Sequence, residues 1–293
     1  MQRPAPALFE THRPHLLALA YRMLGSRAQA EDVVQDTWLR QKDLDLGEIE
    51  FARAYLSRIA TNLCLDRMQS ARARREQYVG CWLPEPLEDA CSDPDPGPQA
   101  HLEYAQNVSV AFMLALERLS PLERAAFLLH DVFDHSFEEV AQRLNRSAAA
   151  CRQLATRART HVRSQQARVE VQREAGEQLL AAFVHGILSG DADALAQLLT
   201  EDALMLSDGG GIVTAVAQPM RGGAMIAKTL IGFTKGHDPA QHRLRFTRIN
   251  GSPAAVLYQQ DRVIQTTTLQ LDAAGRIEAL YVMRNPHKLA HIR

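Results

Sequence analysis

Hydrophobic residues in the first 168 positions recur three and four apart, the spacing of helices that bury one face. The segments "RAQAEDVVQDTWLRQ" (27–41) and "FARAYLSRIATNLCLDRMQSARARR" (51–75) show this spacing and contain no proline. We therefore expect helices throughout residues 9–73, and again in residues 101–168. Between them, "LPEPLEDACSDPDPGPQ" (83–99) is rich in proline and acid, a composition typical of a linker.

After residue 173 the pattern changes. Two helical segments (173–191 and 191–199) and a third (222–235) are followed by alternating apolar and polar positions. The alternation predicts strands at 242–249, 253–260, 262–271 and 276–285, separated by the turn sequences "NGSP", "QD" and "DAAG". The chain is thus expected to have a helical N-terminal half and an α+β C-terminal domain.

A helix-turn-helix pattern lies within "HSFEEVAQRLNRSAAACRQLATRARTHV" (135–162). Ser136 and Glu139 have the spacing of a capping box, which marks a helix start. Asn145 is suited to the left-handed conformation that ends a helix, and Ser147 is suited to cap the next one. A helix, a short turn and a second helix follow from these signals.

The second helix of this pattern has two unlike faces. At ~100° per residue its apolar residues gather on one side and its arginines on the other. Residues 143–168 contain seven arginines and no acid, although the whole chain has a formal net charge of -1. Arginine and glutamine side chains read base edges and phosphates in the major groove, so this face indicates DNA binding. A solvated basic helix face is the alternative.

The first helical block carries two other surfaces. "AEDVVQDTWLR" (30–40) presents acids, a glutamine and a tryptophan, which suit a basic protein partner rather than DNA. Residues 51–78 contain six arginines against Asp66 and Glu76, a net of 6 − 2 = +4. Two basic surfaces on either side of a linker suit two DNA sites some distance apart.

Composition narrows the class of protein further. No apolar run approaches the ~18 residues of a membrane helix, and the charged, proline-containing start is unlike a signal peptide. The four cysteines form no CxxC motif, which favours reduced thiols over a metal site or a disulfide. We expect a cytoplasmic protein without a metal or cofactor.

These segments resemble the bacterial extracytoplasmic-function sigma factors over residues 8–162. The remainder is similar to a subgroup with a SnoaL-like C-terminal extension, whose motifs are WLPEP, DGGGK and NPDKL. The first motif is intact at residues 82–86, whereas Ile212 replaces the lysine of the second and His287 the aspartate of the third. The resemblance implies a multidomain fold: two all-α sigma domains, the second a helix-turn-helix, and then an α+β, cone-shaped, NTF2-like domain. The expected boundaries are 1–76 and 103–168 for the sigma domains, 77–102 for the linker and 172–293 for the extension.

By resemblance, the sigma domains bind core RNA polymerase (its β′ clamp helices and β flap) and promoter DNA. The residues implied in core binding are Asp32, Gln35, Asp36, Trp38 and Arg40; Val33, Val34 and Leu39 are expected to be core, and Trp38 is open between the two. Those implied at the −10 element, where a base is flipped out, are Asn62, Asp66, Arg67, Arg72, Arg74 and Arg75. The alternatives are that Asn62 ends a helix and that the arginines form a solvated run. Those implied at the −35 element are Arg146, Ser147, Arg152, Gln153, Thr156, Arg157, Arg159 and Arg163.

The extension is implied to regulate the sigma domains in cis. Trp82 and Leu83 are apolar residues in a polar linker, which suits a docking anchor. We expect the WLPEP segment to pack near the DGGG and NPHK segments; the residues in this interdomain set are Trp82, Leu83, Pro84, Glu85, Pro86, Asp208, Gly209, Gly210, Gly211, Asn285, Pro286 and Lys288. Candidates for an acid or base inside the cone are Asp208, His185, His242 and Asp202, but none lies in a pattern that demands catalysis.

The leading hypothesis is a sigma factor for promoter-specific transcription initiation with a built-in regulator, and not an enzyme. One alternative is a DNA-binding regulator whose C-terminal domain senses a small-molecule ligand. Another is a SnoaL-type cyclase or isomerase fused to DNA-binding helices. The acidic helix and the segment at 51–75 favour the first hypothesis, because a repressor or an activator needs neither.

Overall fold

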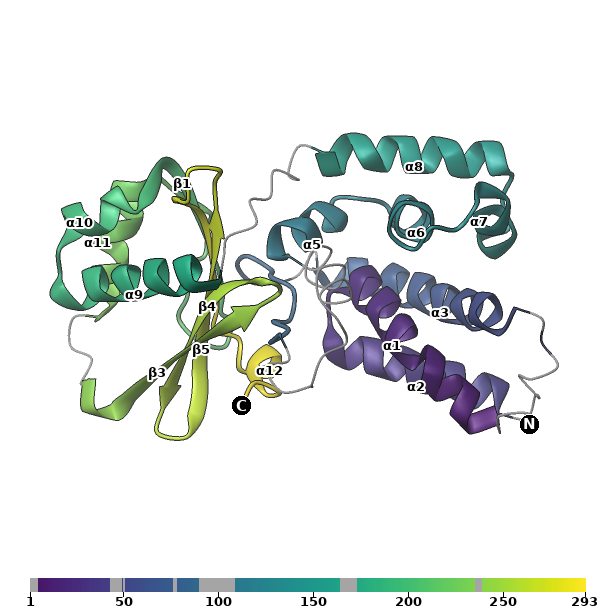
Figure 1. The fold of residues 1–293 in the computed structure, drawn as a ribbon, viewed down its shortest axis with the longest axis horizontal. Coiled ribbons are helices and arrows are strands. Elements are labelled where there is room, and N and C mark those ends of the chain that lie inside the picture. The colour runs from purple at the N-terminus through teal and green to yellow at the C-terminus, as the bar shows by residue number, and fades with distance from the viewer. Residues whose placement is uncertain are drawn as a thin grey trace. The chain divides into compact units, whose positions relative to one another are not determined.

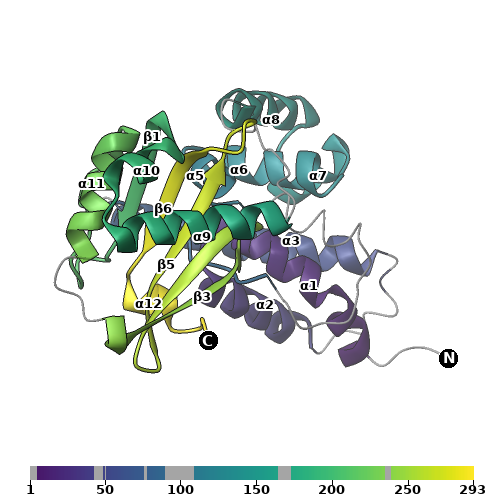
Figure 2. The same ribbon diagram turned by 60° about the vertical axis from the view of Figure 1, so that its left-hand side comes forward.

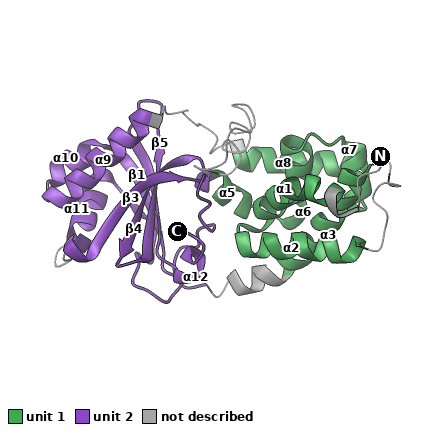
Figure 3. Cartoon of the chain, turned by 60° about the horizontal axis from the view of Figure 1, so that its bottom comes forward, with its two compact units in different colours: residues 1–77, 112–165 green, residues 78–111, 166–293 purple. Residues whose placement is uncertain are grey.

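The structure is a computed structural model that describes residues 5–42, 49, 51–75, 78–89, 109–163, 173–234 and 239–293. The chain divides into two compact units (Figure 3). The first combines Met1–Gln77 with Phe112–Gln165, and the second combines Tyr78–Ala111 with Gln166–Arg293.

The first unit is helical, as its hydrophobic spacing predicts (Figure 1). Its helices are α1 (Ala5–Leu24), α2 (Arg27–Gln41), α3 (Ala52–Arg75), α5 (Val110–Glu117), α6 (Pro121–Phe127), the π-helical turn Leu128–Val132, α7 (Phe137–Leu144) and α8 (Ala148–Arg163). Helices α1, α2 and α3 pack together around buried apolar side chains such as Leu16, Val33 and Leu56. Cys64 and Cys151 are buried thiols, and burial raises the pKa of Cys64 to about 12.

The helix-turn-helix is confirmed in its local detail. Ser136 accepts a hydrogen bond from the Glu139 amide, and the Glu139 side chain accepts one from Ser136 in return. Asn145 ends α7 at φ 52° and ψ 54°, in the left-handed region. Ser147 then accepts a hydrogen bond from the Ala150 amide at the start of α8. The turn is therefore built from local side-chain to backbone bonds.

A buried arginine joins the two helical blocks within the first unit. Arg124 on α6 is 1% exposed, and its guanidinium donates to the Met23 carbonyl near the end of α1 (2.7 Å) and to Glu117 (2.7 Å). Burial lowers the pKa of Arg124 to about 9, so the group still carries its charge at neutral pH. The carbonyls at a helix C-terminus are the negative end of the helix dipole, so the contact with α1 offsets part of the cost of burying this cation.

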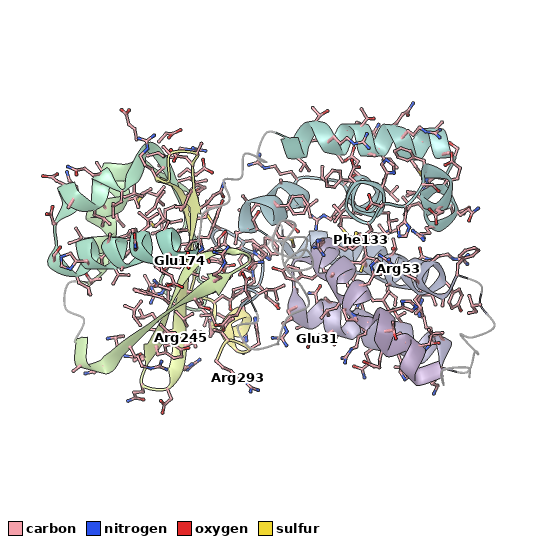
Figure 4. The ribbon with its side chains drawn as sticks, in the orientation of Figure 1. Glu31, Arg53, Phe133, Glu174, Arg245 and Arg293 are labelled. Carbon is pink, nitrogen blue, oxygen red and sulfur yellow. The ribbon has the colours of Figure 1, made fainter. Side chains whose placement is uncertain are left out.

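His15 forms a second link between the blocks. Its Nδ1 accepts from Arg53 (3.0 Å) and its Nε2 lies 3.0 Å from the Ser57 hydroxyl, while its ring meets Phe133 edge-on. Figure 4 labels Arg53 and Phe133. Since an arginine can only donate, the Nε2 of His15 carries the proton and donates to Ser57. Burial, with Arg53 nearby, lowers the pKa of His15 to about 3.

The second unit is an α+β domain with one six-stranded sheet. Its elements are α9 (Arg173–Ser189), α10 (Ala192–Gln197), β1 (Leu199–Asp208), β2 (Met220–Arg221), α11 (Gly223–Thr234), the 3-10 turn Pro239–Gln241, β3 (His242–Ile249), β4 (Ser252–Gln259), β5 (Arg262–Leu271), β6 (Ile277–Met283) and α12 (Pro286–Leu289). The strand order is β2-β1-β6-β5-β4-β3; β1 and β6 are parallel and the other neighbours antiparallel.

The core of this domain lies between the sheet and three helices. Helices α9, α10 and α11 cover one face, and α9 runs across the sheet (Figure 2). Phe183, Ile226, Leu269 and Leu280 are buried there. This confirms the expected α+β class and all four predicted strands, whereas β1 and β2 were not predicted. Among the described residues no helix is long and apolar enough to cross a membrane.

Candidate nucleic-acid, partner and regulatory interfaces

Helix α8 buries its apolar side and presents its arginine side to solvent. Cys151, Leu154, Ala158 and Val162 are buried, along with Ala155. The residues predicted to read the −35 element lie on the other side: Arg146, Ser147, Arg152, Gln153, Thr156 and Arg157 are exposed, and Arg159 is half-buried. The side chain of Arg163 lies outside the described residues.

Three of these arginines are held by acids of neighbouring elements. Arg152 pairs with Glu138 (2.8 Å) and its guanidinium lies 5.3 Å from the centroid of the Phe137 ring. Two further pairs are Arg157 with Glu123 (2.8 Å) and Arg159 with Asp131 (2.6 Å). These acids orient the guanidinium groups, and DNA phosphates would have to compete with them for the arginines.

The acidic face of α2 is in the predicted place. Asp32, Gln35 and Arg40 are exposed and Asp36 is half-buried, while Val33 and Val34 are core. Trp38 is half-buried and packs on Phe9, with ring centroids 5.1 Å apart.

The prediction that Leu39 is core was wrong, since it is 50% exposed. The buried positions of α2 are Ala30, Val33, Val34, Thr37 and Gln41. At ~100° per residue Leu39 points about 180° from their centre, between Asp32 and Gln35. The helical spacing itself could have shown this. Leu39 is thus an apolar residue in the middle of an acidic face.

Arg67 joins this acidic face to α3. Its guanidinium donates to Asp36 (2.7 Å) and Asp32 (3.4 Å), and to the Gln29 carbonyl (3.3 Å). A residue predicted to hold DNA phosphates therefore pairs with two residues predicted to hold the polymerase. This pairing could not be predicted from local patterns, because 31 and 35 positions separate the partners.

The alternative that Asn62 ends a helix is wrong, since α3 continues to Arg75. No glycine or proline interrupts this segment, and its hydrophobic spacing runs through it. Asn62 and Asp66 are both exposed and four residues apart, so they share one outer face with Arg58. The side chains of Arg72, Arg74 and Arg75 lie outside the described residues.

Residues 78–89, which we call the strap, lie along the C-terminal domain. This segment was expected to belong to a linker, yet its hydrogen bonds with Asp208, Asn250 and Lys288 join it to that domain. Leu83 is 2% exposed, and Pro84 and Pro86 are buried as well. Proline has no amide hydrogen, so burying it in an extended segment leaves no donor without a partner.

The buried carboxylate of Asp208 holds the first part of the strap. Asp208 is 0% exposed and accepts from the Tyr78 hydroxyl (2.6 Å), the Leu83 amide (2.9 Å) and the Gly210 amide (2.9 Å). Lys288 donates to the same carboxylate (2.8 Å) and to the Leu83 carbonyl (2.6 Å). One buried ion pair therefore binds both backbone groups of Leu83.

Aromatic rings surround the cation of this pair. The Lys288 ammonium lies 4.6 Å from the ring centroid of Trp82 and 5.0 Å from that of Tyr78. Asn285, which caps α12, donates to the Tyr78 hydroxyl (2.9 Å). Burial and the hydrogen bond to Asp208 raise the pKa of Tyr78, so its phenol stays protonated and donates. The structure thus brings together the WLPEP, DGGG and NPHK segments.

The glycines of the DGGG segment are required by close approach. Gly210 has φ +65°, and a Cβ there would lie 2.3 Å from the Asn285 side-chain nitrogen. The two departures from the subgroup motifs lie apart from the ion pair: Ile212 is 53% exposed and the His287 side chain is exposed. The absence of a charge at Ile212 and at His287 therefore does not disturb the pair between Asp208 and Lys288.

The second part of the strap binds the end of β3 and the turn after it. Leu87 exchanges two hydrogen bonds with Asn250, and His291 donates to the Pro86 carbonyl (2.6 Å). Glu88 pairs with Arg245 and accepts from Thr247. Arg245 also donates to the Arg293 carbonyl (2.5 Å), and Figure 4 labels both residues.

Sequence reasoning missed several of these residues. Tyr78, Asn250, Arg245 and His291 belong to no motif, and no local signal in the sequence pointed to them. Of the candidates for an acid or base, His185 and Asp202 are exposed, His242 is half-buried on the edge strand, and Asp208 is taken up by the strap.

Comparison with known proteins gives concordant matches. The model of sigma-70 region 2 matches residues 8–74, and the model of sigma-70 region 4 matches residues 109–162. The ECF RNA polymerase sigma factor SigJ of Mycobacterium tuberculosis (strain H37Rv) is 38% identical over 232 residues, which is 79% of this chain and 73% of the relative. The probable ECF RNA polymerase sigma factor SigI of the same species (strain CDC 1551) is 29% identical over 292 residues, 99% and 96% of the two chains. The crystal structure of M. tuberculosis SigJ has a TM-score of 0.77 at 31% identity, and covers 97% of this chain and 98% of that one.

Proposed function

The chain belongs to the extracytoplasmic-function (ECF) family of RNA polymerase sigma factors, and from this premise we propose that it binds core polymerase through α2 and directs initiation at specific promoters through α3 and α8. The family relationship carries the proposal. For the functional division we propose the boundaries expected from the sequence, residues 1–76, 77–102, 103–168 and 172–293, with residues 78–89 of the second segment attached to the C-terminal domain.

Helix α2 supplies the face for core polymerase. The surface around Asp32, Gln35 and Asp36 is acidic, with Leu39 exposed at its centre. An apolar residue surrounded by polar ones is the usual composition of a protein interface centre and rim. Leu39 is therefore added to the core-binding residues, and it is the residue whose loss should weaken docking most.

Helices α3 and α8 supply the DNA faces. On α3, Asn62 and Asp66 are exposed polar groups that can hydrogen-bond a flipped base, with basic residues around them. On α8, Arg152 and Gln153 are exposed near the start of the helix, where base edges are read, and Arg146 and Arg157 suit phosphates.

Arg152→Ala tests the assignment of α8. Losing one base contact costs about 1–3 kcal/mol, so initiation by the polymerase complex should fall about fivefold or more and relax in specificity at one −35 position. Arg262→Ala, an exposed arginine on β5, is the matched control and should leave initiation unchanged. If Arg152→Ala supports initiation as well as Arg262→Ala does, the proposal that α8 recognises the −35 element is wrong.

The C-terminal domain regulates the sigma domains in cis through the strap. The observation that supports this is the buried Asp208–Lys288 pair, which binds the chain immediately after the first sigma domain. Because Asp208 is engaged by the strap, we propose that the domain regulates rather than catalyses. A small-molecule ligand of the domain would act by changing this attachment.

Trp82→Ala tests the regulatory role. It removes the larger of the two rings beside the Lys288 ammonium and should change promoter activity while both units remain folded by circular dichroism. Unchanged promoter activity in a folded variant would contradict the role of the strap.

A further inference from the structure

Arg67 occupies the acidic face that the proposed function assigns to core polymerase. It extends from α3 to Asp36 and Asp32, two acids one turn apart on α2. The side chain of Arg67 is 28% exposed, against 42% for Asp36 and 63% for Asp32. The two carboxylates are therefore more accessible from solvent than the guanidinium that pairs with them. A basic group of a binding partner can contact the carboxylates from the solvent side.

The same arginine comes from the helix assigned to the −10 element. Arg67 follows Asp66 directly and lies five positions after Asn62. Its guanidinium has two sets of anions within its reach, the carboxylates of α2 and the phosphates of DNA beside α3. Carboxylate and phosphate both suit the planar fork of arginine, so the two compete for one group.

We propose that Arg67 couples the two binding events, and this inference rests on the proposed function of α2 and α3. In the free chain Arg67 neutralises Asp32 and Asp36. When a basic surface of core polymerase binds these acids, Arg67 is released and becomes available to a promoter phosphate. Each event then favours the other, because binding couplings are reciprocal.

The coupling has a predictable size. Partly exposed ion pairs are worth up to about 1 kcal/mol, so releasing the acids costs core binding about threefold to fivefold in affinity. A phosphate contact contributes a slope of about −0.7 to −0.9 when the logarithm of promoter affinity is plotted against that of salt concentration.

Arg67→Gln in the full chain tests the proposal with purified core polymerase. Binding to core should tighten about threefold to fivefold, because the acids are already free. The resulting polymerase complex should bind promoter DNA with a salt slope shallower by about 0.7 to 0.9. A misfolded variant would weaken both events, so opposite signs cannot arise from structural damage.

Arg276→Gln is the matched control, because Arg276 pairs with Asp272 on the second unit at 3.2 Å and carries the same charge. It should alter neither measurement. Weaker or unchanged core binding by Arg67→Gln would overturn the proposal, as would an unchanged salt slope. If the wild-type chain itself fails to bind core polymerase, the proposed function fails instead, and the two failures are distinguished.

Discussion

Lys288→Met should release the strap without unfolding the C-terminal domain. The substitution keeps most of the side-chain volume and removes the charge that pairs with Asp208, which is 0% exposed. Removing one partner of a buried ion pair costs about 3–5 kcal/mol, because the other charge stays buried without its counterion. When the strap detaches, water reaches the Asp208 carboxylate and hydrates its charge. Detachment of the strap therefore removes most of the cost of the unpaired carboxylate.

Hydrogen exchange at the Leu83 amide measures this opening, since that amide donates to Asp208 (2.9 Å). A loss of 3 kcal/mol accelerates exchange by about a hundredfold, at a factor of ten for each 1.4 kcal/mol. Lys228→Met, an exposed lysine on α11, is the control and should leave the Leu83 amide unchanged.

A double-mutant cycle tests whether loss of the pair between Asp208 and Lys288 causes the strap to open. Asp208→Asn alone also breaks the pair, but combining it with Lys288→Met leaves two neutral side chains and no buried unpaired charge, and the amide oxygen of the asparagine can still accept from the Leu83 amide. The double variant should therefore be less destabilised than the sum of the two single variants by about 1–3 kcal/mol. Unaltered exchange in Lys288→Met, or strict additivity in the cycle, would refute the reasoning.

Three other predictions follow from the contacts above. Gly210→Ala should destabilise the protein much more than Gly275→Ala, and urea unfolding of the two variants measures the difference. Both positions have positive φ, but only at Gly210 would a Cβ meet another side chain. Arg124→Met removes the guanidinium that donates to Glu117 and to the Met23 carbonyl, so the first unit should lose about 3–5 kcal/mol in unfolding free energy and its melting temperature should fall. An unchanged melting temperature would contradict this. Stability of the same unit should fall on acidification, because the pKa of His15 is lowered from 6.5 to about 3 in the folded state and only the unfolded state binds a proton in this range. This proton binding costs about 1.6 kcal/mol between pH 6.5 and 5. Urea titrations at both pH values should show a smaller loss in His15→Asn.

Local patterns predicted the fold well. The four strands β3–β6, the capping box at Ser136 and the left-handed Asn145 depend on residues within a few positions of each other, and the sequence displays such relations directly. Strand β1 was not predicted because it runs into the DGGG segment, whose glycines and buried Asp208 obscure the alternation.

Contacts between distant residues were predicted only where a family motif identified both partners. The motif segments at 82–86, 208–211 and 285–289 were expected to meet, and the structure joins them through Lys288 and Asp208. Arg67 with Asp36 and Leu87 with Asn250 had no such motif, since each pairing depends on how whole elements pack. Leu39 was a different error, because counting its angle along α2 would have placed it on the surface.

Promoter-specific transcription with purified core polymerase tests the central claim most directly, comparing the full chain with Lys288→Met and Lys228→Met. We predict that all three proteins start transcription at the same site and that Lys288→Met alone differs in yield. Failure of the full chain to bind core and initiate would contradict its proposed role at promoters. Equal yields from the full chain and a Lys288→Met variant whose strap is open by hydrogen exchange would contradict regulation through the strap.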